Sequence, residues 1–445
     1  MITLREGLRF KGPFQAAFLG AGGKSAAIFQ LAGQLQGPVF VTTTTHLSTE
    51  QAALGDQHLV LEPGKLLPSL EVAKLPDLTV ISGPQEGGRV SAIEPEILKE
   101  LSLFARQNGI PMLVEADGAR QLALKAPAEH EPAIPDFVDV VVVVAGLSAL
   151  HKPLDKNLVH RPERFAEIAD MAVGELVEAE HIGRVLAHER GGLKRIPEGA
   201  RRVVLLNQAE GDMRLSAAKR LAKELTRDFD AVLSASLSPP DGSKPGVVAT
   251  YEPVAGILLA AGGSERAGSP KQLLDWNKKP FVRQVAETAL AAGLSSLVVV
   301  TGAFRADVEM ALVGLPITAV NNPDWLSGQA SSVKAGLAAL PPRTGAAIFM
   351  VVDQPQLPVA LLESLRAEHA RSLAPIIATQ VDGKRSNPVL FDRSTFSDFD
   401  AIEGDVGGRA IFAHHRVVWL PWLDASLAID VDTLEDYQRL LNSST

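Results

Sequence analysis

The sequence contains no cysteine, which excludes disulfide bonds, thiolate metal sites and a cysteine nucleophile. Aromatic residues make up only 5% of the 445 residues. No apolar run is long enough to cross a bilayer, and the longest, from Phe137 to Leu147, is interrupted by Asp139. The first residues, Met1 to Lys11, lack the apolar segment of a signal peptide. These absences predict a cytoplasmic protein without a membrane segment.

What is present is typical of a large α/β protein. A chain of 445 residues exceeds what one core normally fills, so we expect two domains. Strands rich in Val, Ile and Leu alternate with amphipathic helices, which predicts two doubly wound domains with mainly parallel sheets. A run of Ser, Pro and Gly breaks the pattern, and we place domains at 1–236 and 254–445 with a linker at 237–253. The net charge of −9 predicts no nucleic-acid or membrane partner.

A loop of small and charged residues follows the apolar run Val254–Leu258. It reads Leu-Ala-Ala-Gly-Gly-Ser-Glu-Arg-Ala-Gly-Ser-Pro-Lys over residues 259–271. Its glycines let backbone amides approach phosphate oxygens, while Arg266 and Lys271 supply positive charge. The spacing is neither that of the P-loop nor that of the dinucleotide-binding motif. The loop therefore predicts a polyphosphate site of another kind.

This loop resembles the Leu-Ala-Ala-Gly-x-Ser-x-Arg-x-Gly-x-x-Lys signature of the MobA-like nucleotidyltransferase family, whose members make the dinucleotide form of the molybdenum cofactor. Further segments match the family's motifs in the same order: Asn322–Trp325, Gly328–Gly336, Met350–Pro355, Asn387–Phe391, Gly404–Arg409 and Asp430–Thr433. Leu-Ala-Ala-Gly and the Gly-Asp-x-Gly-x-Arg block resemble the cytidylyltransferase branch. The guanylyltransferase branch usually reads Leu-x-Gly-Gly at the first site.

The resemblance implies a Rossmann-like fold that transfers CMP from CTP to molybdenum-molybdopterin and releases pyrophosphate. It implies catalytic roles for Arg266, Lys271 and Asp353, and Mg²⁺ ligation by Asp353 and Asp432. The implied nucleotide-binding residues are Leu259, Ala260, Ala261, Gly262, Gly263, Ser264, Arg266, Lys271, Gly302 and Asp353. The implied acceptor-binding residues, which would contact the molybdopterin-type cofactor, are Ser331, Ser332, Asn387 and Arg409.

A second phosphate-loop candidate opens the chain. Phe14–Leu19 reads as a strand, and Gly-Ala-Gly-Gly-Lys-Ser follows it over residues 20–25. Gly-Lys-Ser is the end of a P-loop, where the lysine reaches phosphate and the serine ligates Mg²⁺. The first glycine of the standard motif would fall on Phe18, so the loop is atypical. We expect ATP or GTP here, bound by Gly20, Gly22, Gly23, Lys24 and Ser25, with Glu115 and Asp117 at the end of a neighbouring apolar strand.

Four segments of this half, Gly20–Lys24, Thr42–His46, Val114–Arg120 and Val159–Glu163, resemble the selenium-dependent hydroxylase accessory family. That resemblance implies a molybdenum hydroxylase as the client. Both halves of the chain then point to the same client and its cofactor.

Two alternatives remain open from the sequence. The second half could be a guanylyl- or sugar-phosphate nucleotidyltransferase, which shares the metal and phosphate residues and differs in its base pocket. The chain could instead be a cofactor carrier or insertion chaperone. The presence together of Arg266, Lys271, Asp353 and Asp432 disfavours a carrier for the second half. For the first half, a nucleotide-gated carrier is as good a hypothesis as catalysis.

Overall fold

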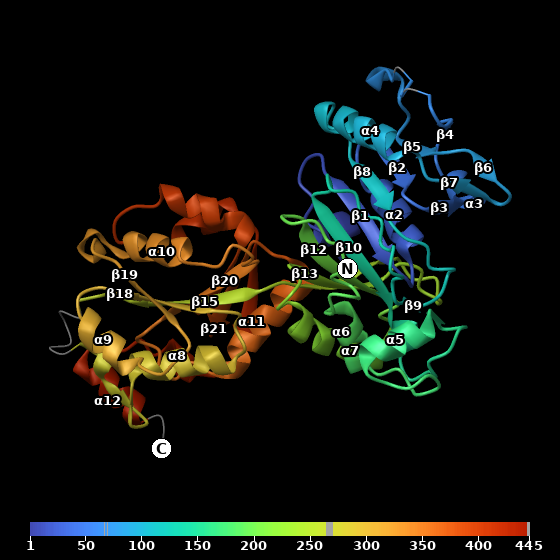
Figure 1. Ribbon diagram of the computed structural model, residues 1–445. Coiled ribbons are helices and arrows are strands. Elements are labelled where there is room, and N and C mark those ends of the chain that lie inside the picture. The colour runs from blue at the N-terminus through green and yellow to red at the C-terminus, as the bar shows by residue number, and fades with distance from the viewer. Residues whose placement is uncertain (66, 69, 264–269, 443–445) are drawn as a thin grey trace. The chain divides into compact units, whose positions relative to one another are not determined.

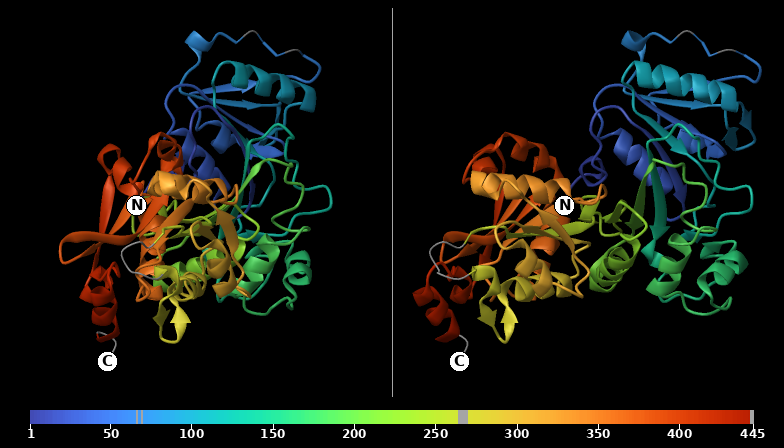
Figure 2. Two further views of the ribbon diagram at one scale, coloured as in Figure 1. Left: turned by 90° about the vertical axis from the view of Figure 1, so that its left-hand side faces the viewer. Right: turned by 60° about the vertical axis from the view of Figure 1, so that its left-hand side comes forward.

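The computed structural model describes residues 1–65, 67–68, 70–263 and 270–442, and it divides into two compact units, Met1–Tyr251 and Glu252–Thr445 (Figure 1). Each unit is an α/β structure built on a mostly parallel sheet, as the sequence predicts. Helices cover both faces of each sheet (Figure 1, Figure 2). Among the described residues, no helix is long and apolar enough to span a membrane.

The first unit contains a 9-stranded sheet with the order β14-β13-β12-β10-β1-β8-β2-β5-β4. Neighbouring strands are parallel except β14, which runs antiparallel to β13. β10 is buried along its whole length, as expected for a valine-rich strand covered on both faces. The strands are β1 (Gln15–Gly20), β2 (Val39–Thr43), β4 (Gln57–Val60), β5 (Leu78–Ser82), β8 (Met112–Glu115), β10 (Val140–Gly146), β12 (Arg201–Asn207), β13 (Ala231–Ser236) and β14 (Gly246–Tyr251).

The helices of this unit bury their apolar stripes on the two faces of the sheet. α1 and α2 contribute to one core, and α5, α6 and α7 contribute to the opposite one. α4 begins with a proline in its first turn, which suits a position where the backbone N–H has no helical partner. The helices are α1 (Leu4–Gly7), α2 (Lys24–Ala32), α3 (Thr49–Ala52), α4 (Pro95–Gln107), α5 (Pro162–Ala169), α6 (Ala179–Leu186) and α7 (Gly211–Leu225). Small sheets join β3 (His46–Ser48), β6 (Gln85–Glu86) and β7 (Arg89–Ser91), and β9 (Leu124–Lys125) with β11 (Val159–His160).

The strand order places the first phosphate-loop candidate at a topological switch point. The chain leaves β1 through α2 and reaches β2 on one side, whereas β10 lies on the other side of β1. In open α/β sheets, ligands bind in the crevice at the carboxyl ends of strands where the chain changes direction.

The second unit contains a 7-stranded sheet with the order β19-β18-β15-β20-β22-β21-β23. All neighbours are parallel except the pairs that include β22, which is antiparallel to β20 and β21. The carboxyl ends of β15, β18 and β20 therefore meet at one edge. The strands are β15 (Val254–Ala260), β18 (Leu297–Thr301), β19 (Thr318–Asn321), β20 (Ala346–Val351), β21 (Ile376–Val381), β22 (Lys384–Asp392) and β23 (Val417–Trp422), with a small hairpin of β16 (Asp275–Trp276) and β17 (Lys279–Pro280).

Two cores sandwich this second sheet. In Figure 1, α10 lies above the sheet and α8 and α9 lie below it. The helices are α8 (Phe281–Ala291), α9 (Arg305–Ala311), α10 (Gln329–Ala338), α11 (Val359–Ser372) and α12 (Leu434–Asn442). Short 3₁₀ segments include η3 (Lys271–Leu273), η4 (Trp325–Ser327), η5 (Arg393–Ala401) and η6 (Gly408–His414).

The structure corrects the predicted linker at 237–253. Residues 246–251 form β14, which pairs with β13 and closes the edge of the first sheet. Val247 is fully buried and Ala249 nearly so, because alternate residues of this edge strand face the core. The prediction missed β14 because this short apolar strand follows a run of Ser, Pro and Gly and is stabilised by its partner strand β13.

Candidate functional site

The loop after β15 is held in place from two directions. The buried Gln272 side chain donates hydrogen bonds to the carbonyl oxygens of Ala260 at 3.2 Å and Gly262 at 2.7 Å. From the other side, Gly302 approaches so closely that an added Cβ would lie 2.6 Å from the oxygen of Ala261. The loop backbone is therefore held in place up to Gly263, the last described residue of this part of the loop. Nothing in the sequence pattern singled out Gln272.

The predicted residues of this loop fall partly outside the described part of the chain. Leu259 and Ala260 end β15, and Ala261, Gly262 and Gly263 follow directly. Ser264 and Arg266 lie outside the described residues. The geometry of the loop can thus be followed up to Gly263 and again from Pro270.

A group of charged residues meets at the carboxyl edge of the same sheet. Asp353 follows β20, and its carbonyl oxygen accepts a hydrogen bond from the amide of Val431 at 3.2 Å. That contact brings the segment carrying Asp430 and Asp432 to Asp353. The ammonium group of Lys271 pairs with the Asp432 carboxylate. Residues separated by more than 150 positions in the sequence therefore form one cluster, with Lys271 as the positive charge beside the acidic groups.

Asp353 has the environment of a cation ligand. Burial, and then the charges of Asp430 and Asp432, raise its pKa to about 6 against the opposing charge of Lys271. Its Oδ1 atom is buried and has no hydrogen-bond partner in the part of the chain that the structure describes. An unpaired buried carboxylate oxygen is costly unless a cation binds it. The buried carboxylate of Asp353 with the more exposed carboxylate of Asp432 nearby fits Mg²⁺, which takes few protein ligands and keeps several waters.

Asp430 contacts another residue that the sequence reasoning did not single out. The side chain of Gln354 donates a hydrogen bond to Asp430 Oδ1 at 2.7 Å and another to the carbonyl oxygen of Leu427 at 3.1 Å. Gln354 is thus engaged in holding the segment before Asp432 against β20. The Asp432 carboxylate, by contrast, pairs with the ammonium group of Lys271.

The predicted acceptor-binding residues have different surroundings. The buried amide of Asn322 donates hydrogen bonds to the hydroxyls of Ser331 at 2.8 Å and Ser332 at 2.9 Å, so both serines take part in an internal network. Asn387 lies in β22, the strand beside β20. Arg409 is exposed in η6. Asn322 follows β19 directly and is the anchor of this region.

The glycine-rich loop of the first unit is packed tightly on the ends of two neighbouring strands. Gly20 has a φ of 91°, and an added Cβ would lie 2.2 Å from the oxygen of Val144 in β10. Gly23 has a φ of 128°, and its Cβ would lie 2.2 Å from the amide nitrogen of Asn207 at the end of β12. That amide donates a hydrogen bond to Gly22 O at 2.7 Å. Only glycine fits these positions, and Asn207 acts as a support for the loop.

Lys24 and Asp117 form a buried ion pair within this loop. Lys24 Nζ donates to Gly20 O at 2.7 Å and lies 3.1 Å from Asp117 Oδ1. The Asp117 carboxylate also accepts the Gly20 amide at 3.0 Å and contacts Lys125 at 2.9 Å. Lys24 is 5% exposed and Asp117 is 1% exposed. The carboxylate therefore contacts the lysine and an amide of the loop, as a bound anion would.

Ser25 and Glu115 meet on the other side of Lys24. The Ser25 hydroxyl donates to Glu115 Oε2 at 3.2 Å, and the Thr43 hydroxyl donates to the backbone oxygen of Glu115 at 3.0 Å. Burial raises the pKa of Glu115, with Lys24 opposing the shift and Asp117 adding to it. A serine hydroxyl beside a buried carboxylate is the arrangement that P-loop proteins use for Mg²⁺.

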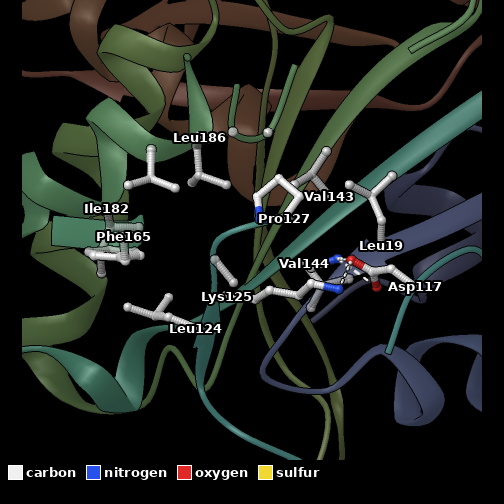
Figure 3. Close-up of a pocket in the computed structure, with 15 residues that line it drawn as sticks. Leu19, Asp117, Leu124, Lys125, Pro127, Val143, Val144, Phe165, Ile182 and Leu186 are labelled. Atoms are coloured by element: carbon white, nitrogen blue, oxygen red, sulfur yellow. Dashed lines mark hydrogen bonds and ion pairs between the residues drawn. The ribbon is translucent and has the colours of Figure 1, made fainter. Parts of the chain in front are cut away.

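The Lys24–Asp117 ion pair belongs to a network of charged residues that extends away from the loop. Lys125 lies 2.9 Å from Glu131, and Arg161 contacts both oxygens of Glu131 at 2.8 and 3.2 Å. Figure 3 shows Asp117 and Lys125 at one end of a small adjacent cavity of about 30 Å³ that is partly open to solvent. The rest of the cavity is lined by apolar side chains, among them Leu124, Phe165, Ile182, Val185 and Leu186.

Two protein-family models match the chain. The model described as YqeC protein matches residues 16–163, and the model described as MobA-like NTP transferase domain matches residues 256–418. Each match falls within one of the two compact units.

Curated relatives match one unit each. The chain is 31% identical over 204 residues to "Uncharacterized protein YqeC" of Escherichia coli, covering 44% of this chain and 77% of the relative. It is 34% identical over 203 residues to "Nicotine blue oxidoreductase" of Paenarthrobacter nicotinovorans, covering 42% of this chain and 96% of the relative. It is 28% identical over 198 residues to "Purine catabolism protein PucB" of Bacillus subtilis, covering 42% and 94%.

Among solved structures, Rv0371c from Mycobacterium tuberculosis is 29% identical, with a TM-score of 0.39, and the match covers 42% of this chain and 97% of that one. A nucleotidyl transferase from Methanothermobacter thermautotrophicus is 20% identical, with a TM-score of 0.39, covering 43% and 96%.

Proposed function

We propose that the second unit of this chain, which belongs to the MobA-like NTP transferase family, transfers CMP from CTP to molybdenum-molybdopterin. The products are the cytosine dinucleotide cofactor and pyrophosphate. The coarser reaction class, nucleotidyl transfer, follows from the family. The nucleotide and the acceptor are the proposed parts. The first unit belongs to the YqeC family.

In this reaction the terminal phosphate of the pterin attacks the α-phosphorus of CTP in line, and pyrophosphate leaves. Such a transfer needs alignment and neutralised charge more than covalent help from the protein. Lys271, with Arg266 and Ser264 of the same loop, binds the triphosphate and stabilises the charge that grows on the leaving group. Asp353 and Asp432 would hold Mg²⁺, which would supply positive charge to neutralise the phosphate oxygens.

The observation that carries the proposal is the buried Oδ1 of Asp353, which has no hydrogen-bond partner among the described residues. It lies beside Lys271 and Asp432, at the sheet edge where the loop 259–263 also ends. Ser331, Ser332, Asn387 and Arg409 remain the proposed acceptor side. For the serines, the hydrogen bonds to Asn322 favour a supporting role over direct contact.

The test is pyrophosphate release by the purified full chain with Mg²⁺ and molybdenum-loaded molybdopterin, offering CTP, GTP and ATP separately. Release with CTP alone supports the proposal, and release with GTP alone moves the chain to the guanylyl alternative. Because one relative is named an oxidoreductase, the same protein is also assayed for oxidation of NADH and NADPH. Nicotinamide oxidation without pyrophosphate release overturns nucleotidyl transfer for this chain.

For the first unit we propose nucleotide binding that gates delivery of the cofactor to a molybdenum hydroxylase in the cytoplasm. Support comes from Lys24, and from Ser25 with Glu115, at the switch point of the sheet. Asp117 pairs with Lys24 and so competes with a phosphate group for this lysine. The test is binding of fluorescent ATP and GTP analogues, with hydrolysis measured in parallel. Turnover lost in Lys24→Ala indicates an enzyme, and binding without turnover indicates a switch or carrier.

A further inference from the structure

The side chain of Trp325 lies against the phosphate loop of the second unit. A Cβ added to Gly263 would lie 3.0 Å from Cζ3 and 3.1 Å from Cη2 of the indole. A Cβ added to Gly302 would lie 3.0 Å from the Cβ of Trp325. The indole is only partly buried and packs on the core that includes Ala261. Trp325 therefore touches the loop at its last described residue and also the turn after β18.

The same short segment is locked to a second loop, the predicted acceptor loop Gly404–Arg409. Gly328 has a φ of 111°, and its Cβ would lie 2.2 Å from the carbonyl carbon of Gly404. The amide of Ala330 donates to the oxygen of Gly404 at 3.1 Å. A Cβ at Gly407 would lie 2.4 Å from the side-chain oxygen of Gln329. No side chain could be added at either glycine without moving the two loops apart.

Asn322 fixes this segment to the sheet. Besides its hydrogen bonds to the two serines of α10, its side-chain oxygen accepts the amide of Asp324 at 3.0 Å. Residues 322–330 thus form one hydrogen-bonded unit that touches the phosphate loop at one end and the acceptor loop at the other. A rigid element between two sites carries energetic coupling when both sites contact it.

We propose that Trp325 is a positioning residue that couples the two halves of the site: the indole holds the phosphate loop, and Gly328 transmits its position to the acceptor loop. This inference rests on the proposed nucleotidyl transfer and adds a mechanism by which nucleotide binding prepares the acceptor side. By linkage, the factor by which bound nucleotide raises the affinity for the acceptor equals the factor by which bound acceptor raises the affinity for the nucleotide.

The first experiment measures the dissociation constant of CTP with Mg²⁺ by calorimetry on the full chain. We expect Trp325→Ala to weaken CTP binding about tenfold and Trp325→Phe to recover most of the loss. Leu326→Ala is the matched control, because Leu326 is the next residue and its side chain is 77% exposed. A folded Trp325→Ala protein with unchanged CTP affinity overturns the inference. Wild-type protein that binds CTP, GTP and ATP equally poorly overturns the proposed function as well.

A double-mutant cycle keeps the test independent of any fold defect in one variant. Gly263→Ala places a methyl group against the indole and should weaken CTP binding about tenfold. In the Trp325→Phe background the smaller ring leaves room, so the same change should cost much less. An effect of Gly263→Ala that is identical in both backgrounds overturns the contact as the cause. The acceptor KM should rise with the CTP constant in Trp325→Ala, whereas a merely structural defect would lower kcat and stability without a shift in either constant.

Discussion

The two predicted phosphate loops of this chain pair their lysines with carboxylates in different surroundings. In the first unit Lys24 is buried and paired with Asp117, which is itself buried and contacts Lys125. In the second unit Lys271 pairs with Asp432, whose side chain is 56% exposed, while the buried Oδ1 of Asp353 has no partner among the described residues. The first loop therefore already holds an internal anion, whereas the second presents a carboxylate that a cation can complete. The arrangement in the first unit suits a site whose Lys24–Asp117 pair opens when a ligand binds. The arrangement in the second unit suits a site that is ready for catalysis once a cation is bound.

The largest effect that sharpens this comparison is expected at Asp353. Asp353→Asn should lower nucleotidyl transfer by about 10³-fold, because it removes a metal ligand worth several kcal/mol in the transition state. The measurement is kcat/KM from pyrophosphate release, with Asp307→Asn in the exposed first turn of α9 as the control. If Asp353→Asn were as active as the control, Asp353 would not serve as a metal ligand. The second loop would then not differ from the first by a carboxylate that a cation completes.

The same substitution should affect stability with the opposite sign. A carboxyl whose folded pKa is raised from 3.8 to about 6 destabilises the fold progressively as the pH rises through that range, and the cost is absent below it. In chelator-treated protein, Asp353→Asn should therefore melt higher than wild type at pH 8, and the two should melt equally only below the unfolded pKa of 3.8. A lower melting temperature at pH 8 would show that Asp353 stabilises the fold instead of serving a cation.

Loss of Lys271 comes next in size. Lys271→Ala should lower kcat/KM by about 10²-fold, the effect of removing one charged donor from a transition state. Lys278→Ala, in the exposed turn of the neighbouring hairpin, should change it little. Similar losses in both variants would indicate a general charge effect and not a positioned lysine.

In the first unit, removal of the internal anion should strengthen binding. Asp117→Asn frees Lys24 from its carboxylate, and we expect ATP or GTP analogues to bind about tenfold tighter, the size of one partly compensated ion pair. Lys125 keeps Glu131 as a partner in this variant. Weaker binding in a folded Asp117→Asn protein would instead make Asp117 a nucleotide or metal ligand, and the two loops would then be alike.

The smallest effect is expected at the outer end of the charge chain. Burial alone would raise the pKa of Glu131, but hydrogen bonds from Lys125 and Arg161 outweigh it and lower the pKa to about 2. A lowered pKa stabilises the fold above the ordinary value of 4.5, and the contribution is lost as the pH falls toward 2.

Glu131→Gln should therefore lower the melting temperature of the first unit at pH 7 by about 2–4 °C, from roughly 1 kcal/mol. The difference from wild type should vanish near pH 2. Glu198→Gln, at an exposed position, is the control for a general charge effect. A difference in melting temperature that persists at pH 2 would show that the Glu131 carboxylate does not stabilise the fold through its ion pairs. The Lys24–Asp117 pair would then belong to the loop alone.

Much of the second unit could be predicted from sequence. The apolar run before Leu259 and the polar ends of β20 and β15 place their residues on one sheet edge, because carboxyl ends of parallel strands coincide. The segment predicted as a linker, residues 237–253, could not be predicted correctly in this way. The strand β14 is stabilised by β13, and a short edge strand behind Ser, Pro and Gly has no distinctive local pattern.

The sequence by itself determined the α/β class and the existence of two units, and it predicted both phosphate loops, since glycine spacing and apolar periodicity are local properties. Tertiary structure alone decided that Lys24 faces Asp117, that Asp353, whose Oδ1 has no partner among the described residues, lies near Asp432, and that Gly263 packs on Trp325. Each of these pairs is separated by at least 60 positions. Contacts over such distances arise from how strands and helices pack, and no local pattern records them.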